Sequence, residues 1–367
     1  MSNHPRYAAE GAPAIRAAAT ALPPHQIDQE TLSLLLRELW GEEYRASRRW
    51  KTVFDQVNRT VRVGRRSLAL APGDYPAALE SFASANAAWR RVASELATAA
   101  AADALGRAGI APADVGHLFF VTGTGIATPS IDARIVNRLG IGRGVRRTPI
   151  FGLGCAGGVA AVARATDYIR AFPDRTALVV SVELCSLTLQ RGDLSVANII
   201  ASSLFGDGAA AVVLGPAANG NAAAPRVIAT RPYFYPDSEA LMGWDVVASG
   251  LKVILSPAIP TLIRERLAAD VDDFLGTCGL TRAAITHWIA HTGGNRVLEA
   301  MSEALELGPE ALARSWRMLE ETGNLSSASV LFVLDDLLSS GEARPGDYGM
   351  MIAVGPGFSA EFALLQW

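Results

Sequence analysis

One cysteine stands where a helix should begin. Cys155 lies in FGLGCAGGVAAVARA, residues 151–165, between glycines and just before an alanine-rich run. The unpaired N–H groups and the dipole at a helix N-terminus favour negative charge, and a thiol attacks as the thiolate. The position therefore predicts a nucleophilic Cys155, whose pKa is lowered by the helix start and by a neighbouring imidazolium.

One of the five histidines also stands at a position suited to chemistry. His291 ends the apolar run HWIAH and is followed by TGGN, and layered α/β folds bind ligands at strand ends. His117 and His287 recur at equivalent places at the start of a strand, which predicts structural roles for both. His4 and His25 lie in the N-terminal region, outside this pattern.

Two segments share a pattern at a constant offset of 170 residues. LGRAGIAPADVGHLFFVTG (105–123) and LGTCGLTRAAITHWIAHTG (275–293) each read as a helix end, a glycine stop and a strand that ends in a loop. Similarity in a fixed order indicates an internal duplication. The alternation of strands and helices predicts a layered α/β fold made of two duplicated halves.

A second pair of segments brings an asparagine to the position of the cysteine. GLGCAGGVAAVARATDYIRA (152–171) aligns with ETGNLSSASVLFVLDDLLSS (321–340), so Asn324 matches Cys155, each at the opening of a helix. Two halves related by a pseudo-twofold axis would place these helix starts face to face, with His291 beside them.

A thiol, an imidazole and a carboxamide in one place support acyl chemistry. Cys155 can hold an acyl group as a thioester, and the N–H groups of His291 and Asn324 can stabilise charge on a thioester oxygen. If the incoming unit is malonyl, loss of carbon dioxide leaves an enolate that attacks the cysteine-bound acyl group. This route needs no metal and no redox cofactor.

Composition limits the other classes of function. The net charge of −3 with no basic block gives no support for nucleic-acid binding, and no run of 18 apolar residues suggests a membrane span. Cys155, Cys185 and Cys278 form neither a metal motif nor a disulfide framework, which favours a reducing compartment, the cytosol. The Pro-, Gly- and Ala-rich stretch 215–226 marks the boundary between the halves.

Each half then carries part of the chemistry. Residues 1–215 form a half with the nucleophilic cysteine, and residues 216–367 form a half with the histidine and the asparagine.

Together these motifs resemble the type III polyketide synthases, the chalcone-synthase-like enzymes of the thiolase fold. FGLGCAGG, WIAHTGG and ETGNLSSASVLFVLDD are similar to the family's cysteine, histidine and asparagine motifs, and SSLFGDGAAAVVLG and VGPGFSAE to further signatures, in family order. The resemblance implies an αβαβα layered homodimer. It also implies that an acyl-CoA starter is loaded on Cys155, while His291 and Asn324 promote decarboxylation of malonyl-CoA. CoA thioesters would be substrates, with no cofactor.

The resemblance also implies residues that bind substrate. Phe205 matches a phenylalanine between the CoA tunnel and the cavity, Thr188 a cavity-shaping threonine, and Ser326 a cavity serine near Asn324. Lys51, Arg59 and Arg62 lie in the segment where the family places cations for CoA, although they do not align cleanly.

Two departures from the plant enzymes bear on the starter. Val253 stands where a second gatekeeper phenylalanine is found, which should widen the entrance or open a side tunnel. Thr128 precedes Pro129 where plant enzymes have a methionine that reaches into the partner's cavity. These features resemble bacterial members that extend fatty acyl starters, and predict a medium- or long-chain acyl-CoA starter and an alkylpyrone or alkylresorcinol product.

Three alternatives stay open. The first is an enzyme like ketoacyl synthase III, which condenses once and takes carrier-protein substrates, although HTGG after His291 is unlike its Gln-Ala-Asn continuation. The second is a chalcone- or stilbene-synthase-like enzyme with an aromatic starter. The third is a catalytically idle homologue that serves as a binding subunit, against which the intact cysteine, histidine and asparagine motifs argue.

Overall fold

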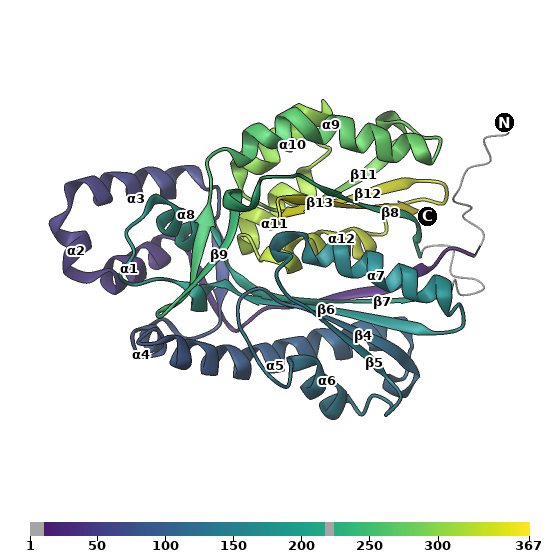
Figure 1. Cartoon of the computed structure of the whole chain (residues 1–367), viewed down its shortest axis with the longest axis horizontal. Coiled ribbons are helices and arrows are strands. Elements are labelled where there is room, and N and C mark those ends of the chain that lie inside the picture. The colour runs from purple at the N-terminus through teal and green to yellow at the C-terminus, as the bar shows by residue number, and fades with distance from the viewer. Residues whose placement is uncertain (1–10, 217–223) are drawn as a thin grey trace.

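The chain forms five layers in the order helix, sheet, helix, sheet, helix. This computed structural model describes residues 11–216 and 224–367, and its layers are stacked from α5 and α6 at one side to α9 and α10 at the other (Figure 1). The layered α/β fold of two similar halves is confirmed. His4 lies outside the described residues.

The two sheets have the same pairing pattern. In the first, β4 is parallel to β6, β6 antiparallel to β7, and β7 antiparallel to β1. In the second, β11 is parallel to β12, β12 antiparallel to β13, and β13 antiparallel to β8. β5 adds a parallel edge strand to the first sheet. The strands of the first sheet are β5 (Arg146–Ile150), β4 (Val115–Val121), β6 (Thr176–Leu184), β7 (Asp207–Gly215) and β1 (Ala14–Ala21), and those of the second are β11 (Ile285–Ala290), β12 (Tyr348–Gly355), β13 (Ser359–Gln366) and β8 (Arg226–Phe234).

A constant offset relates corresponding strands, as the sequence predicts. β4 begins at Val115 and β11 at Ile285, which lie 170 residues apart. His117 and His287 occupy equivalent places on these strands, where Nε2 of each contacts a neighbouring side chain, Thr148 Oγ1 at 2.8 Å or Asp347 Oδ2 at 3.1 Å. Both histidines therefore have structural partners.

Three layers of helices separate and cover the two sheets. The middle layer holds α7 (Gly157–Ala171) and α12 (Ser329–Ser340), which lie between the sheets with small and aliphatic side chains inside. Its core draws on both halves, with Val159 and Val162 from one and Leu331 and Leu334 from the other. The outer layers hold α5 (Phe82–Ala108) and α6 (Ile131–Leu139) on one side, and α9 (Ile259–Thr277) and α10 (Asn295–Leu305) on the other, while α11 (Ala313–Thr322) packs on α12.

The long α5 shows how local sequence positions a layer. Ser81 forms a capping box with Ser84 at its start, and Gly109 ends it in the left-handed conformation. Between them, alanines such as Ala97 and Ala101 are fully buried, so the helix lies close to the first sheet. The Ala-rich sequence of α5 therefore permits close packing on β1, β6 and β7.

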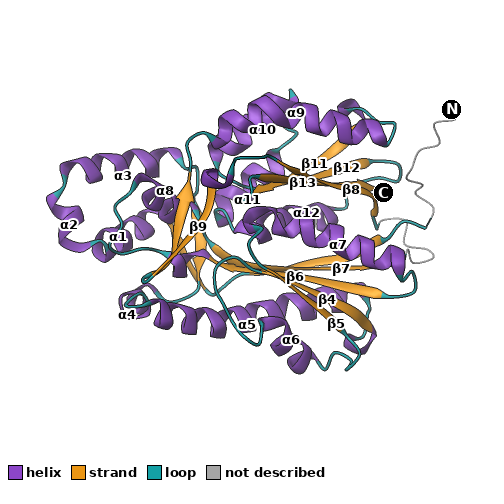
Figure 2. Ribbon diagram, in the orientation of Figure 1, coloured by secondary structure: helices purple, strands orange, loops and turns teal. Residues whose placement is uncertain are grey.

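Shorter elements gather at one end of the layers. They lie at the left in Figure 2, at the ends of the strands, and some of them line the pockets described below. They are β2 (His25–Asp28), α1 (Gln29–Leu39), α2 (Gly41–Ala46), α3 (Arg48–Thr60), β3 (Arg65–Leu68), α4 (Tyr75–Ala78), α8 (Val196–Leu204), β9 (Met242–Val247) and β10 (Gly250–Leu255).

The predicted boundary between the halves lies between two strands. β7 ends at Gly215 and β8 begins at Arg226, and a single bridge between Ala14 and Arg226 joins the two sheets into one of nine strands. Because the halves share a middle layer, the division at residue 215 stays a prediction about the sequence. No helix in the described part of the chain is long and apolar enough to cross a membrane.

Candidate active site

Cys155 lies in a single 3₁₀ turn at the start of α7. The turn η3 spans Gly154–Ala156, and α7 follows from Gly157. A Cβ on Gly158 would lie 2.2 Å from the carbonyl oxygen of Ser327, so only glycine lets the start of α7 approach the opposite half this closely. The glycines around Cys155 therefore serve the contact between the halves.

Asn324 comes from the other half and its amide is held in one orientation. Asn324 Oδ1 accepts a hydrogen bond from the backbone N–H of Ser326 at 2.7 Å, and the hydroxyl of Ser329 lies 3.4 Å from it. Asn324 also acts on the Cys155 thiol as a hydrogen-bonding partner that lowers the pKa of Cys155. Because Oδ1 is already engaged, the NH₂ group is the end of the amide that remains available to the thiol. The Cys155 Sγ also lies 3.7 Å from Ser326 Oγ.

The alignment of Asn324 with Cys155 is only partly correct. The second half has its own 3₁₀ turn, η7 (Ser326–Ala328), directly before α12, so η7 corresponds to the turn that holds Cys155. Asn324 stands two residues before η7, where its backbone pairs with Phe205 in an isolated bridge. The amide reaches the thiol from an extended segment and not from a helix opening.

His291 follows directly after β11. Its backbone N–H donates to Ile352 O at 2.8 Å, and its side chain is buried, with Nδ1 lacking a hydrogen-bond partner in the described part of the chain. Burial lowers the pKa of His291 to about 3. The imidazole is therefore neutral at physiological pH and retains one N–H donor.

The three residues line one pocket. Cys155, His291 and Asn324 share a cavity of about 1240 Å³, including its open mouth, with Ser326 and Phe205 also in its wall. The sequence-based expectation that two distant halves bring these side chains together agrees with this geometry. Apolar residues of α8 and of the β9–β10 hairpin form much of the remaining wall.

The expected lowering of the cysteine pKa is wrong for this structure. Burial raises the pKa of Cys155 to about 12, and the carboxylate of Glu183 raises it further, while hydrogen bonds from Ser326 and Asn324 act in the opposite direction. The neutral His291 supplies no positive charge. Desolvation of a charged thiolate therefore outweighs the contribution of the helix start.

Glu183 is a buried acid beneath the site that the sequence analysis missed. It accepts hydrogen bonds from Gly123 N and Thr124 Oγ1, each at 2.9 Å, and from Ser327 Oγ. Burial raises its own pKa. An acidic residue inside the otherwise apolar strand VVSVELC was the available signal.

Phe205 and Val253 stand between two cavities. Both line the cysteine pocket and a second, narrow cavity of about 520 Å³, including the space at its opening, and Trp244 does the same. The second cavity has an apolar wall of leucines, and Thr188 lies in it and not in the cysteine pocket. The leucines are Leu32, Leu35, Leu36, Leu39, Leu68 and Leu189. Trp244 was not expected from the sequence.

The remaining expected binding residues lie elsewhere. Lys51 and Arg59 are exposed on α3 and line two separate surface hollows, and Arg62 is exposed over the ring of Trp316. Thr128 is exposed and lines neither cavity of this chain. Their side chains therefore do not belong to the cysteine pocket within one chain.

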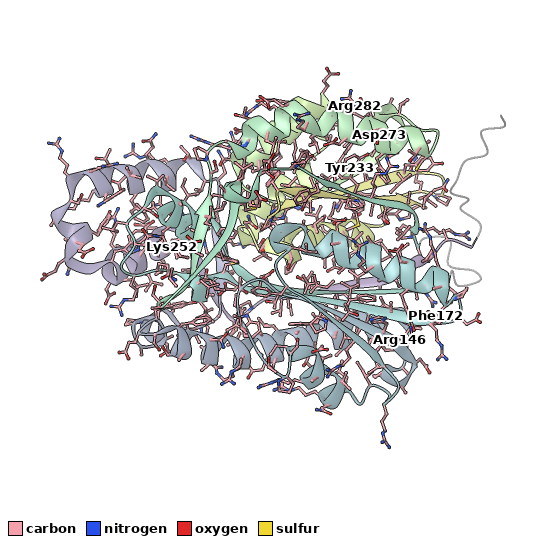
Figure 3. The ribbon with its side chains drawn as sticks, viewed as in Figure 1. Arg146, Phe172, Tyr233, Lys252, Asp273 and Arg282 are labelled. Carbon is pink, nitrogen blue, oxygen red and sulfur yellow. The ribbon has the colours of Figure 1, made fainter. Side chains whose placement is uncertain are left out.

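A different cation stands at the pocket. Arg296, at the start of α10, is exposed and lines the cysteine pocket, and its place five residues after His291 was the available sequence signal. Lys252, on β10, forms an ion pair with Asp193 at 3.4 Å. Arg146 lies at the other end of the molecule, with its Cζ 4.5 Å from the centroid of the Phe172 ring (Figure 3). No group of metal ligands occurs among residues 11–216 and 224–367.

Comparison with known proteins agrees with this architecture. The sequence models described as "Chalcone and stilbene synthases, N-terminal domain" and "C-terminal domain" match residues 2–218 and 227–366. The chain is 47% identical over 355 residues to 1,3,6,8-tetrahydroxynaphthalene synthase of Streptomyces peucetius subsp. caesius, covering 96% of this chain and 93% of that protein.

Solved structures show the same fold over nearly the full length. A bacterial type III polyketide synthase, 1,3,6,8-tetrahydroxynaphthalene synthase from Streptomyces coelicolor, superposes with a TM-score of 0.88 at 30% identity, covering 97% of this chain and 99% of that one. PKS-I from the brown alga Ectocarpus siliculosus superposes with a TM-score of 0.90 at 27% identity, covering 97% and 98%.

Proposed function

The chain belongs to the chalcone and stilbene synthase family and is an acyltransferase of the type III polyketide synthase class, and we propose that it extends an acyl-CoA starter repeatedly with malonyl-CoA on Cys155. The observation that carries the proposal is the convergence of Cys155, His291 and Asn324 in one pocket. CoA thioesters are substrates in this scheme, and no other cofactor takes part.

Loading begins with two neutral groups. The Cys155 thiol is protonated and His291 is neutral at physiological pH. Attack on the acyl-CoA carbonyl therefore requires transfer of the thiol proton to a base as the carbon–sulfur bond forms, and the imidazole is the candidate base in the pocket. The leaving CoA thiolate takes up a proton, and the starter remains on the enzyme as a thioester.

Extension uses the same imidazole in a different role. Loss of carbon dioxide from malonyl-CoA leaves its electron pair on the α-carbon, as an enolate with negative charge on the thioester oxygen. The amide of Asn324 and the N–H of neutral His291 can donate to that oxygen without an acidic proton nearby. The enolate carbon then attacks the acyl-thioester of Cys155, a carbon–carbon bond forms, and the thiolate is released for the next cycle.

For the starter, we propose a medium- or long-chain fatty acyl-CoA and an alkylpyrone or alkylresorcinol product. The leucine-lined cavity beyond Phe205 and Val253 supports this, since an alkyl chain is stabilised there by leaving water. A flat aromatic starter has no need of a second cavity.

A second candidate starter is malonyl-CoA itself. The similarity to a 1,3,6,8-tetrahydroxynaphthalene synthase at 47% identity supports it. One experiment separates the two: purified protein is given malonyl-CoA alone, or malonyl-CoA with dodecanoyl-CoA or coumaroyl-CoA, and the product masses are measured. Dodecanoyl products with more than one extension support the first proposal, products from malonyl-CoA alone the second, and a single β-keto product neither.

We also propose a homodimer in the cytosol. Thr128 is exposed outside the pockets of its own chain, and the side chain of Ile126, two residues away, is 45% exposed, which supports burial of this loop against a second copy. Cys155, Cys185 and Cys278 are all free thiols, which supports a reducing compartment. Light scattering of the purified protein tests the dimer.

For the CoA phosphates, we propose Arg296. It is the exposed cation in the wall of the cysteine pocket, and it stands at a helix N-terminus, where backbone N–H groups also favour anions.

A further inference from the structure

A buried arginine outside both cavities holds the segment that divides them. Arg66, on β3, is fully buried. Its guanidinium donates to Phe205 O at 2.8 Å, to Ser203 O at 2.7 Å and to Gln29 Oε1. Burial lowers the pKa of Arg66 to about 9, so the group still carries its charge at neutral pH, which the nearby Asp207 favours.

The same segment is joined to the catalytic amide. Asn324 N donates to Leu204 O at 3.0 Å, and Gly206 N donates to Asn324 O at 2.9 Å. These two bonds flank Phe205, so the residue that separates the cavities and the residue that reaches the thiol share one short backbone bridge.

The bridge leaves no free space. A Cβ on Gly206 would lie 2.3 Å from Thr322 O, and one on Gly323 would lie 2.7 Å from Leu204 O. A shift of residues 203–206 must therefore move Asn324 as well, because the two backbones are in direct contact.

We propose that Arg66 is a positioning residue that fixes the positions of Phe205 and Asn324 relative to each other. Arg66 thereby links the choice of starter to the rate of extension. The proposal rests on the proposed roles of those two residues. Two carbonyls of one segment accept from one planar, charged group, which fixes the segment in two directions. Without it the carbonyls lose buried donors and the segment relaxes, and small displacements of a catalytic group have large effects on rate.

Two variants and one matched control test this. Arg66→Met removes the guanidinium, and Gln29→Leu keeps it but removes the side chain that accepts from it and that also donates to Ser203 O at 3.2 Å. The control is Arg65→Met, on the same strand, whose exposed side chain lies 3.7 Å from Glu321. Folding of each variant is followed by circular dichroism and thermal melting.

Two measurements are made on the folded protein. The first is the rate of Cys155 alkylation by iodoacetamide, which needs no turnover; we expect it to fall at least threefold as the thiol loses its contact with Asn324. The second is product formation from acyl-CoA starters of increasing length; we expect kcat to fall at least tenfold in Arg66→Met and the preferred length to change in both variants.

A purely structural role predicts less folded protein, but unchanged rates and starter preference in the fraction that folds. That result in both variants overturns the proposal, and so does an equal change in Arg65→Met. If wild-type protein extends no starter, the proposed function fails, while the alkylation rates still decide whether Arg66 positions Asn324.

Discussion

The hydroxyl of Ser327 donates a hydrogen bond to the carboxylate of Glu183. A buried acid of the first half therefore holds the turn of the second half next to the Cys155 thiol. The same carboxylate accepts from Gly123 N at 2.9 Å, at the end of β4. Glu183 therefore joins the end of β4 to the turn that follows Asn324.

The first prediction concerns the protonation of Cys155. Because burial raises its pKa to about 12, the thiolate fraction should grow about tenfold per pH unit between about pH 7 and 10. The rate of Cys155 alkylation by iodoacetamide, followed by peptide mass spectrometry, should rise with that slope. A rate that is constant below about pH 8 would show a thiolate already present, contrary to the burial argument.

Replacement of Glu183 by glutamine should activate the thiol. The negative charge of Glu183 raises the pKa of Cys155, so Glu183→Gln should lower that pKa and speed alkylation about threefold or more at pH 8. The control is Glu361→Gln, which changes another buried acid, on β13, that does not act on this thiol. Equal rates in wild type and Glu183→Gln would contradict the electrostatic role.

Loss of the Asn324 amide should separate loading from extension. Asn324→Ala removes the proposed donor to the enolate oxygen, so extension should slow by about 10² to 10³. An acyl group on Cys155 should still be detectable by intact mass after incubation with acyl-CoA. Asn295→Ala is the matched control, since Asn295 lines the same pocket. If Asn324→Ala extends the acyl group as fast as Asn295→Ala does, the amide of Asn324 has no part in the mechanism.

Arg296 should affect the binding of CoA substrates more than their conversion. Arg296→Met removes an exposed cation at the pocket, so KM for malonyl-CoA should rise about fivefold while kcat changes little. Lys51→Met and Arg59→Met should leave KM unchanged, because both side chains lie at other hollows. Steady-state kinetics decide the matter: a larger effect from Lys51 or Arg59 would favour the site expected from the sequence.

A larger side chain at position 253 should restrict the starter. Val253 lies between the two cavities, so Val253→Phe should narrow the passage to the leucine-lined cavity and suppress turnover of long-chain starters, while short-chain starters remain. The control is Val246→Phe, because Val246 lies on the same hairpin and is 71% exposed. An unchanged length profile in Val253→Phe would mean that the chain does not enter the second cavity.

Elements that recur in both halves of the chain could be predicted from the sequence. The offset that relates His117 to His287 predicts β4 and β11, and the glycines around Cys155 mark a close approach that the structure contains. The alignment of Asn324 with Cys155 is off by three residues, because the turn before α12 begins after Asn324. Sequence similarity alone cannot tell which of two adjacent segments opens the helix.

The sequence could not predict the effects of burial or the contacts between residues that lie far apart in the chain. The pKa of Cys155 depends on how completely the halves close over it, and Arg66 meets Phe205 across 139 positions of the chain. Lys51 and Arg59 lie in the segment where the resemblance predicts cations for CoA, but in the structure they are exposed on α3, at other hollows. Composition and spacing give no information about such three-dimensional neighbours.

The shared middle layer has a consequence for how such a chain could arise. α7 and α12 bury their side chains against each other and against both sheets, so a half-length ancestor would have exposed one face of this layer unless it paired with a copy of itself. In such a pair, both helix starts would carry identical residues. Once the halves are fused into one chain, their sequences can differ, so that a thiol stands at one helix start and a separate amide near the other.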